Sequence, residues 1–153
     1  MIAFILPKSF KKPSTYNCFG IQFHKVFEKD LESNSFSYKG KDYTVPCVFQ
    51  IWQKESFPRE VIPKVFENGN YSIVKKHEFP DFAFRRVGGR AGLFIFSGLE
   101  ELSVQSNYFV RTSTTMSQEI IDKLQRIVWK TDNTVAAKSI SKQELIKNLN
   151  EIL

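Results

Sequence analysis

Residues 84–92, FRRVGGRAG, combine the two residue types that contact phosphate groups most readily. The segment holds three of the seven glycines of the chain, and glycine lets a backbone approach a phosphate chain closely. Its three arginines can form charge-assisted hydrogen bonds with phosphate oxygens. The segment has neither the P-loop spacing nor the GxGxxG spacing, so a nucleotide-cradling loop is not indicated. The pattern predicts a nucleic-acid contact, and the alternative is a surface hairpin with a solvated basic face.

Two lysines upstream extend this basic region, so that five basic and two acidic residues lie between positions 75 and 90. The predicted nucleic-acid-binding residues are Lys75, Lys76, Arg85, Arg86, Gly88, Gly89 and Arg90. The chain has a formal net charge of +6 and a sequence pI near 9.3, which favours a polyanionic partner. Charge alone does not identify that partner, because many basic proteins bind no nucleic acid.

Residues 45–52, VPCVFQIW, could form an aromatic platform on which a nucleobase stacks outside the duplex. Most of these side chains are better explained as the core of a central strand. Tyr43, just before the strand, is the first candidate for an exposed stacking ring, and Phe49 is the second.

No catalytic or metal-binding signature is found in the sequence. GxSxG and HExxH are absent, and Glu78 with Asp81 lacks the lysine that a nuclease-like carboxylate pair needs. Two cysteines, Cys18 and Cys47, and two histidines cannot form a zinc site of the usual spacing. We therefore predict no catalytic and no metal-binding residues, and we expect reduced, structural thiols in a cytoplasmic protein.

The apolar runs and turn signals predict a mainly β chain that ends in helices. The opening run IAFILP shows no solvent-facing alternation, which predicts a parallel strand inside a sheet covered on both faces. It is too short for a membrane span or a signal sequence, so we expect a soluble protein and no membrane partner. Further strands are predicted in 21–31, 35–39, 43–53, 71–96 and 108–111, with a turn at 39–42. Thr115 with Gln118 and Ser141 with Glu144 match capping boxes that open two amphipathic helices.

Several segments in order resemble the downstream half of S-adenosylmethionine-dependent DNA methyltransferases of the adenine-N6 type. They are IAFILPKSFKK, VPCVFQIWQK, DFAFRRVGGRAG and SISKQEL, and the resemblance covers nearly the whole chain. It implies an incomplete class I methyltransferase-like (Rossmann-like) α/β sheet, in which a seventh strand is inserted antiparallel. IAFILP would then be the fifth strand and VPCVFQIW would lie in the late strand pair. This division gives later sheet strands in 1–56, a β-rich DNA-contacting insertion in 57–112 and C-terminal helices in 113–153.

The resemblance also implies which parts of the enzyme this chain lacks. The glycine-rich loop for the methionine moiety, the acidic residue for the ribose and the (N/D)PP(Y/F) motif for the target amine are absent. Methyl transfer needs the donor and the amine held in line, so the chain alone is expected to be inactive. S-adenosylmethionine would bind only if an upstream half, as a missing segment or a separate chain, completes the site.

The sequence thus predicts a C-terminal fragment or split subunit of a site-specific DNA adenine-N6 methyltransferase, as in restriction–modification systems. It would supply the wall against the target base, with Tyr43 or Phe49 stacking on the adenine, and the DNA-binding surface. The alternatives are a stand-alone nucleic-acid-binding module without enzymatic activity, and a truncated remnant with an exposed sheet edge.

Overall fold

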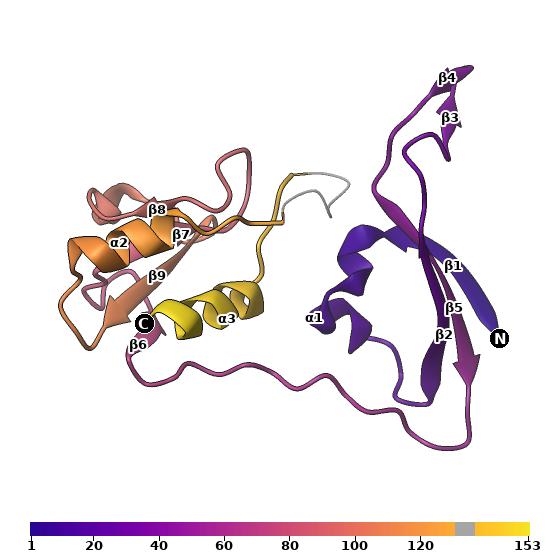
Figure 1. Cartoon of the computed structure of the whole chain (residues 1–153), viewed down its shortest axis with the longest axis horizontal. Coiled ribbons are helices and arrows are strands. Elements are labelled where there is room, and N and C mark those ends of the chain that lie inside the picture. The colour runs from indigo at the N-terminus through magenta and orange to yellow at the C-terminus, as the bar shows by residue number, and fades with distance from the viewer. Residues whose placement is uncertain (131–136) are drawn as a thin grey trace. The chain divides into compact units, whose positions relative to one another are not determined.

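The computed structural model describes residues 1–130 and 137–153, which form two compact units (Figure 1). The first unit is Met1–Pro63, and the second comprises residues 64–130 and 137–153. Both contain antiparallel sheets and short helices, so the chain is a mixed α/β protein. Among the described residues, no helix has the length and apolar character needed to cross a membrane.

A three-stranded sheet forms the centre of the first unit. Strand β5 (Cys47–Lys54) lies between β1 (Ile2–Pro7) and β2 (Phe23–Asp30) and is antiparallel to both. The outer two strands are therefore parallel to each other. They are connected through the 3-10 helix η1 (Lys8–Lys11) and the one-turn helix α1 (Pro13–Tyr16). The prediction that VPCVFQIW forms a central strand is confirmed, since Val48, Gln50 and Trp52 are fully buried.

The prediction for the opening segment is wrong in both orientation and burial. IAFILP forms a strand, but β1 is antiparallel to its neighbour and is an edge strand among the described residues. Only one of its faces is covered: Phe4 packs against Phe19, with ring centroids 5.9 Å apart, whereas Ile5 is 58% exposed. A continuous apolar run suits a strand that is buried on both faces of its sheet. The run does not show, however, whether the same unit supplies a covering layer for each face.

Aromatic rings and one polar chain fill the covered face of this sheet. Phe19 stacks on Trp52 at 4.0 Å, and the Trp52 indole N–H donates to the Gln50 side-chain oxygen at 3.0 Å. The Gln50 amide in turn donates to the Glu28 carboxylate at 2.8 Å. The buried amide is thus satisfied on both sides, as a buried polar group must be.

A small hairpin extends from the ends of β2 and β5 (Figure 1). Its strands, β3 (Ser37–Tyr38) and β4 (Lys41–Asp42), pair antiparallel around the predicted turn. The turn is thereby confirmed, but the strands are two residues long and β5 begins only at Cys47.

An ion pair between η1 and the end of β2 gives the first unit a pH-dependent contact. The Lys11 ammonium donates to Asp30 at 2.8 Å, and this hydrogen bond holds the pKa of the Asp30 carboxyl below its ordinary value. The contribution is therefore complete above the unfolded pKa of aspartate and is lost as the pH falls through the lower folded value. We expect Asp30→Asn to destabilise the protein by at most about 1 kcal/mol at neutral pH, because both groups are partly exposed.

Thermal melts from pH 7 to pH 2 measure this effect. The difference between the two proteins should shrink at the acid end and also in 1 M salt. A difference that stays constant with pH would contradict the assignment.

The second unit places four antiparallel strands in the order β6 (Tyr71–Val74), β9 (Asn107–Thr112), β7 (Phe82–Arg85) and β8 (Phe94–Ile95). A 3-10 helix, η2 (Leu99–Glu101), lies between β8 and β9. These elements confirm the strands predicted within 71–96 and over 108–111.

Helices α2 (Gln118–Gln125) and α3 (Lys142–Ile152) pack on this sheet and share its core (Figure 1). The core is built from aromatic rings on the strands and leucines on the helices: Tyr71, Phe82, Phe84, Phe94, Leu124, Leu145 and Leu149. The predicted capping box of Ser141 and Glu144 is confirmed. Helix α2, however, is capped by Ser117 rather than Thr115, because Ser117 accepts from the Ile120 N–H.

Tyr71 joins β6 to α3 through its hydroxyl group. The hydroxyl donates to the Asn150 side-chain oxygen at 2.7 Å, and burial raises the pKa of Tyr71 to about 12. The group therefore remains a hydrogen-bond donor at neutral pH.

Candidate nucleic-acid interface

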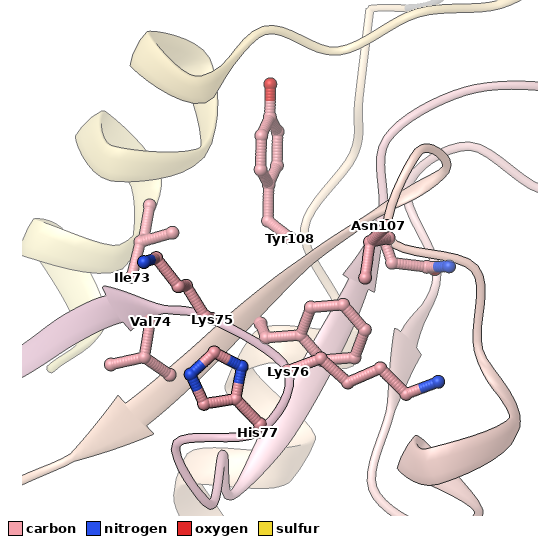
Figure 2. A pocket seen from close by; sticks show the side chains of 9 residues that line it. Ile73, Val74, Lys75, Lys76, His77, Asn107 and Tyr108 are labelled. Carbon is pink, nitrogen blue, oxygen red and sulfur yellow. The ribbon is translucent and has the colours of Figure 1, made fainter.

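A cavity of about 330 Å³ lies where β6 leaves the sheet of the second unit (Figure 2). The pairing of β6 with β9 ends at Val74 and Phe109, whereas β9 starts two residues earlier, at Asn107. Apolar side chains and polar or basic ones both line the cavity. Its lining residues are Ile73, Val74, Lys75, Lys76, His77, Val104, Asn107, Tyr108 and Phe109.

The basic side chains of this cavity come from the segment that directly follows β6 (Figure 2). Lys76 is fixed in place, because its ammonium donates to the Leu102 carbonyl at 2.9 Å. Lys75 is exposed, and its ammonium has no ion-pair or hydrogen-bond partner among the described residues. The cavity therefore has one fixed cation and one that is available to an anion.

Arg86 joins this site through Tyr108. Its guanidinium lies 5.4 Å from the centre of the Tyr108 ring and donates to the tyrosine hydroxyl at 3.4 Å. A second donor, the Arg86 Nε, binds the Gln105 carbonyl at 3.0 Å. The Arg86 guanidinium beside Tyr108 suits a phosphate, and the Tyr108 ring suits a planar group. Lys75 and Lys76 supply further positive charge on the same unit.

Arg85 has a local structural contact instead. Its Nε donates to the Val87 carbonyl at 3.0 Å, within the loop that connects β7 to β8.

Opposite Arg85 on β9 lies Asn107, which is 3% exposed. The Asn107 amide group donates to the Ser103 carbonyl at 2.8 Å, while its side-chain oxygen has no partner among the described residues.

Arg90 and the two glycines before it lie elsewhere in the same loop. Gly88 has a φ of +96°, and a Cβ on Gly89 would meet no atom within 4 Å. Arg90 is exposed and lines a separate depression of about 460 Å³ together with Trp129. The structure thus brings Lys75 and Lys76 to one cavity and places Arg86 beside Tyr108 of its lining, whereas Arg90 belongs to another depression of the unit.

The two candidate stacking residues belong to the first unit. Tyr43 follows the β3–β4 hairpin, is 57% exposed, and lies beside Tyr38 with ring centroids 6.4 Å apart. Phe49 is half-buried on the face of β5 opposite Trp52, beside Phe27 at 6.1 Å. Both rings are therefore accessible to a ligand.

Sequence reasoning missed Tyr108, Asn107 and Phe79. Tyr108 was predicted only as part of a strand, and the strand pattern does not indicate that β6 ends early beside it. Phe79 does carry a signal, because the proline and aspartate that follow it in the polar stretch HEFPD are common turn residues, and turns lie at the surface.

Comparison with known proteins finds no matching family, no similar curated sequence and no similar solved structure. The described residues contain no group of three or more metal-ligating side chains, and Cys47 is buried with its thiol pKa raised by desolvation. The chemistry supported by the geometry is the binding of anions and aromatic rings.

Proposed function

We propose that this chain is the DNA-contacting part of a site-specific adenine-N6 DNA methyltransferase. In this proposal the first unit supplies late strands of the catalytic sheet and a wall against the target base. The second unit supplies basic contacts to the DNA backbone. The methyl-donor site and the residues that orient the target amine come from an upstream half of the enzyme.

The observation that carries this proposal is the strand order of the first unit. Strand β5 runs antiparallel between two strands that are parallel to each other. This arrangement matches the inserted antiparallel strand that the sequence resemblance implies. It therefore supports equating IAFILP with the fifth strand and VPCVFQIW with the inserted one.

The free edge of β1 supports a partner for this sheet. Among the residues that the structure describes, its backbone pairs with β5 alone, and its sequence carries no charge that would protect the other edge from pairing. Beside it, Ile5, Phe27 and Phe49 lie on the face that α1 does not cover. An upstream half that adds strands to β1 and a layer on this face would bury these side chains and complete the donor pocket.

The basic side chains of the second unit support DNA as the ligand. We expect the chain to bind duplex DNA non-specifically, with a dissociation constant of about 10⁻⁴ to 10⁻⁶ M at physiological salt. Lys75→Ala and Arg90→Ala should each weaken binding about 3- to 10-fold and lower the slope of log K against log salt by about 1. Fluorescence anisotropy with a labelled adenine-containing duplex, measured between 50 and 300 mM salt, provides the test.

Lys147→Ala is the matched control, because it removes an exposed charge from α3 of the same unit. The proposal predicts that this variant binds like the unaltered protein. Binding that is undetectable, independent of salt, or equally weakened by Lys147→Ala would contradict it.

Methyl transfer separates the enzyme fragment from a stand-alone nucleic-acid-binding module. Calorimetric titration of the chain alone with S-adenosylmethionine should show no binding. Adding a polypeptide that carries the glycine-rich loop and the (N/D)PP(Y/F) motif should restore transfer of a labelled methyl group to adenine. The stand-alone module would be favoured if the chain binds single strands tightly without this half and if methylation stays absent when the half is added. The exposed ring of Phe79 also fits such a module.

A further inference from the structure

Phe79 lies in the turn between β6 and β7 and is 88% exposed. A phenylalanine ring in water adds none of the stabilisation that burial of the same ring provides. Its backbone is also unfavourable, with a φ of +53° at a non-glycine residue. The following residue is Pro80, which restricts the backbone of the residue before it. The fold therefore retains an exposed ring on a strained backbone, and such outliers cluster at functional positions.

Hydrogen bonds on both sides hold this turn in place. On the β6 side, the Glu78 N–H donates to the Lys75 carbonyl at 3.0 Å, and Arg111 donates to the Glu78 carbonyl at 3.3 Å. On the β7 side, the Asp81 carboxylate accepts from the N–H of Thr112 at 2.7 Å and from its hydroxyl at 3.0 Å. Phe79 is thus presented by a turn fastened to β9, which lowers the entropy cost of binding through it.

A depression of about 450 Å³ lies beside the ring, between this turn and residues 96–100, which include the start of η2. Apolar side chains, Phe96 and Leu99, line it together with Lys76 and His77. Glu100 is the acidic residue of the lining. The same turn carries the Lys75 and Lys76 side chains that line the cavity of Figure 2.

We propose that Phe79 stacks on an unpaired nucleobase of a bound nucleic acid, and that the base enters this depression. The inference rests on the nucleic-acid binding of the proposed function, and it concerns an unpaired base other than the target adenine, whose wall the first unit supplies. Base stacking on an exposed aromatic ring beside backbone-binding cations is the common arrangement in single-strand binding. The neighbouring cations, Lys75 and Arg111, favour this ligand over the apolar surface of another protein, because positive charges beside the ring would attract the adjoining phosphates.

The test compares variants of the full chain in binding a single-stranded oligonucleotide that contains 2-aminopurine. Phe79→Ala should weaken binding about 10-fold or more, and Phe79→Trp should stay within about 2-fold of the unaltered protein. The salt slope should be unchanged in both, because no charge is removed. Phe66→Ala, which truncates another exposed phenylalanine of the second unit, is the matched control and should bind normally.

Phe79→Gly distinguishes a loss of stacking from a loss of folding. Glycine tolerates a positive φ, so this variant should melt at the same or a higher temperature while binding as weakly as Phe79→Ala. If the unaltered protein shows salt-dependent binding and Phe79→Ala binds equally well, the stacking assignment alone would be overturned. The exposed ring would then be assigned to a contact with another protein. If the unaltered protein binds the duplex with salt dependence but does not bind the single strand, the stacking assignment is overturned alone. Absence of salt-dependent binding to both oligonucleotides would overturn this assignment and the proposed function.

Discussion

Gly92→Ala should lower the free energy of unfolding of the second unit by about 3 kcal/mol, combining backbone strain with a steric overlap. Gly92 has a φ of +103°, which is unfavourable for any residue with a Cβ. A Cβ at this position would also lie 2.7 Å from Cδ1 of Trp129. The indole has little room to move, because it packs against Phe84 with ring centroids 4.8 Å apart.

Two other glycines of the same loop separate these contributions. Gly88 has a positive φ, but a Cβ there would come no closer than 3.8 Å to the Arg85 side chain. Gly88→Ala should therefore show the backbone cost alone, about 1–2 kcal/mol. At Gly89 neither cost applies, so Gly89→Ala should change the stability by less than about 0.5 kcal/mol.

Urea denaturation followed by circular dichroism ranks the three variants. Hydrogen exchange in β7 then shows whether the loss lies in the second unit. The expected order of destabilisation is Gly92→Ala, then Gly88→Ala, then Gly89→Ala. Equal stabilities for the first and last variants would show that Trp129 does not pack over Gly92.

These glycines show how far the sequence could predict the candidate site. Glycines beside arginines suit either a phosphate contact or a tight turn, because both need a backbone without side chains. The choice depends on φ and on the side chain across the loop, which is Trp129 for Gly92 and lies 37 positions away in the sequence. Such long-range information is absent from the local pattern. The predicted contacts of Gly88 and Gly89 with nucleic acid remain to be tested by binding measurements.

The secondary structure was easier to predict than its arrangement. Alternating or continuous apolar residues indicated β1, β2 and β5 correctly, because strand formation follows local pattern. The position of β1 at a sheet edge was missed, since a pattern of side chains does not reveal which neighbours are present. Similarly, Ser141 was recognised as a cap from its spacing to Glu144, whereas Thr115 and Ser117 both offered a hydroxyl near the start of α2.

Arg59→Ala should destabilise the first unit by about 3 kcal/mol or more, which corresponds to a fall in melting temperature of at least about 12 °C for a unit of this size. Arg59 is 7% exposed, and its guanidinium donates to four backbone carbonyls. These belong to Phe23, Glu60, Tyr16 and Phe19, at distances between 2.8 and 3.2 Å. Alanine would leave these carbonyls without their charged donor inside the unit.

The planar guanidinium also contacts aromatic faces. It lies 4.3 Å from the centre of the Tyr16 ring and 5.9 Å from that of Trp52. A lysine keeps the charge but concentrates its donors on one nitrogen, so it cannot reach carbonyls on different segments at once. We therefore expect Arg59→Lys to recover less than half of the stability lost in Arg59→Ala.

Lys54→Ala is the matched control, since it removes one exposed positive charge at the end of β5 in the same unit. Its melting temperature should stay within about 2 °C of the unaltered protein, because exposed charges contribute little to stability. Hydrogen exchange in β5 should accelerate strongly in Arg59→Ala and stay unchanged in Lys54→Ala. If Arg59→Ala melts like Lys54→Ala, the guanidinium does not fasten residues 59–62 to the sheet. The boundary of the first unit would then lie before Arg59, close to the predicted division after residue 56.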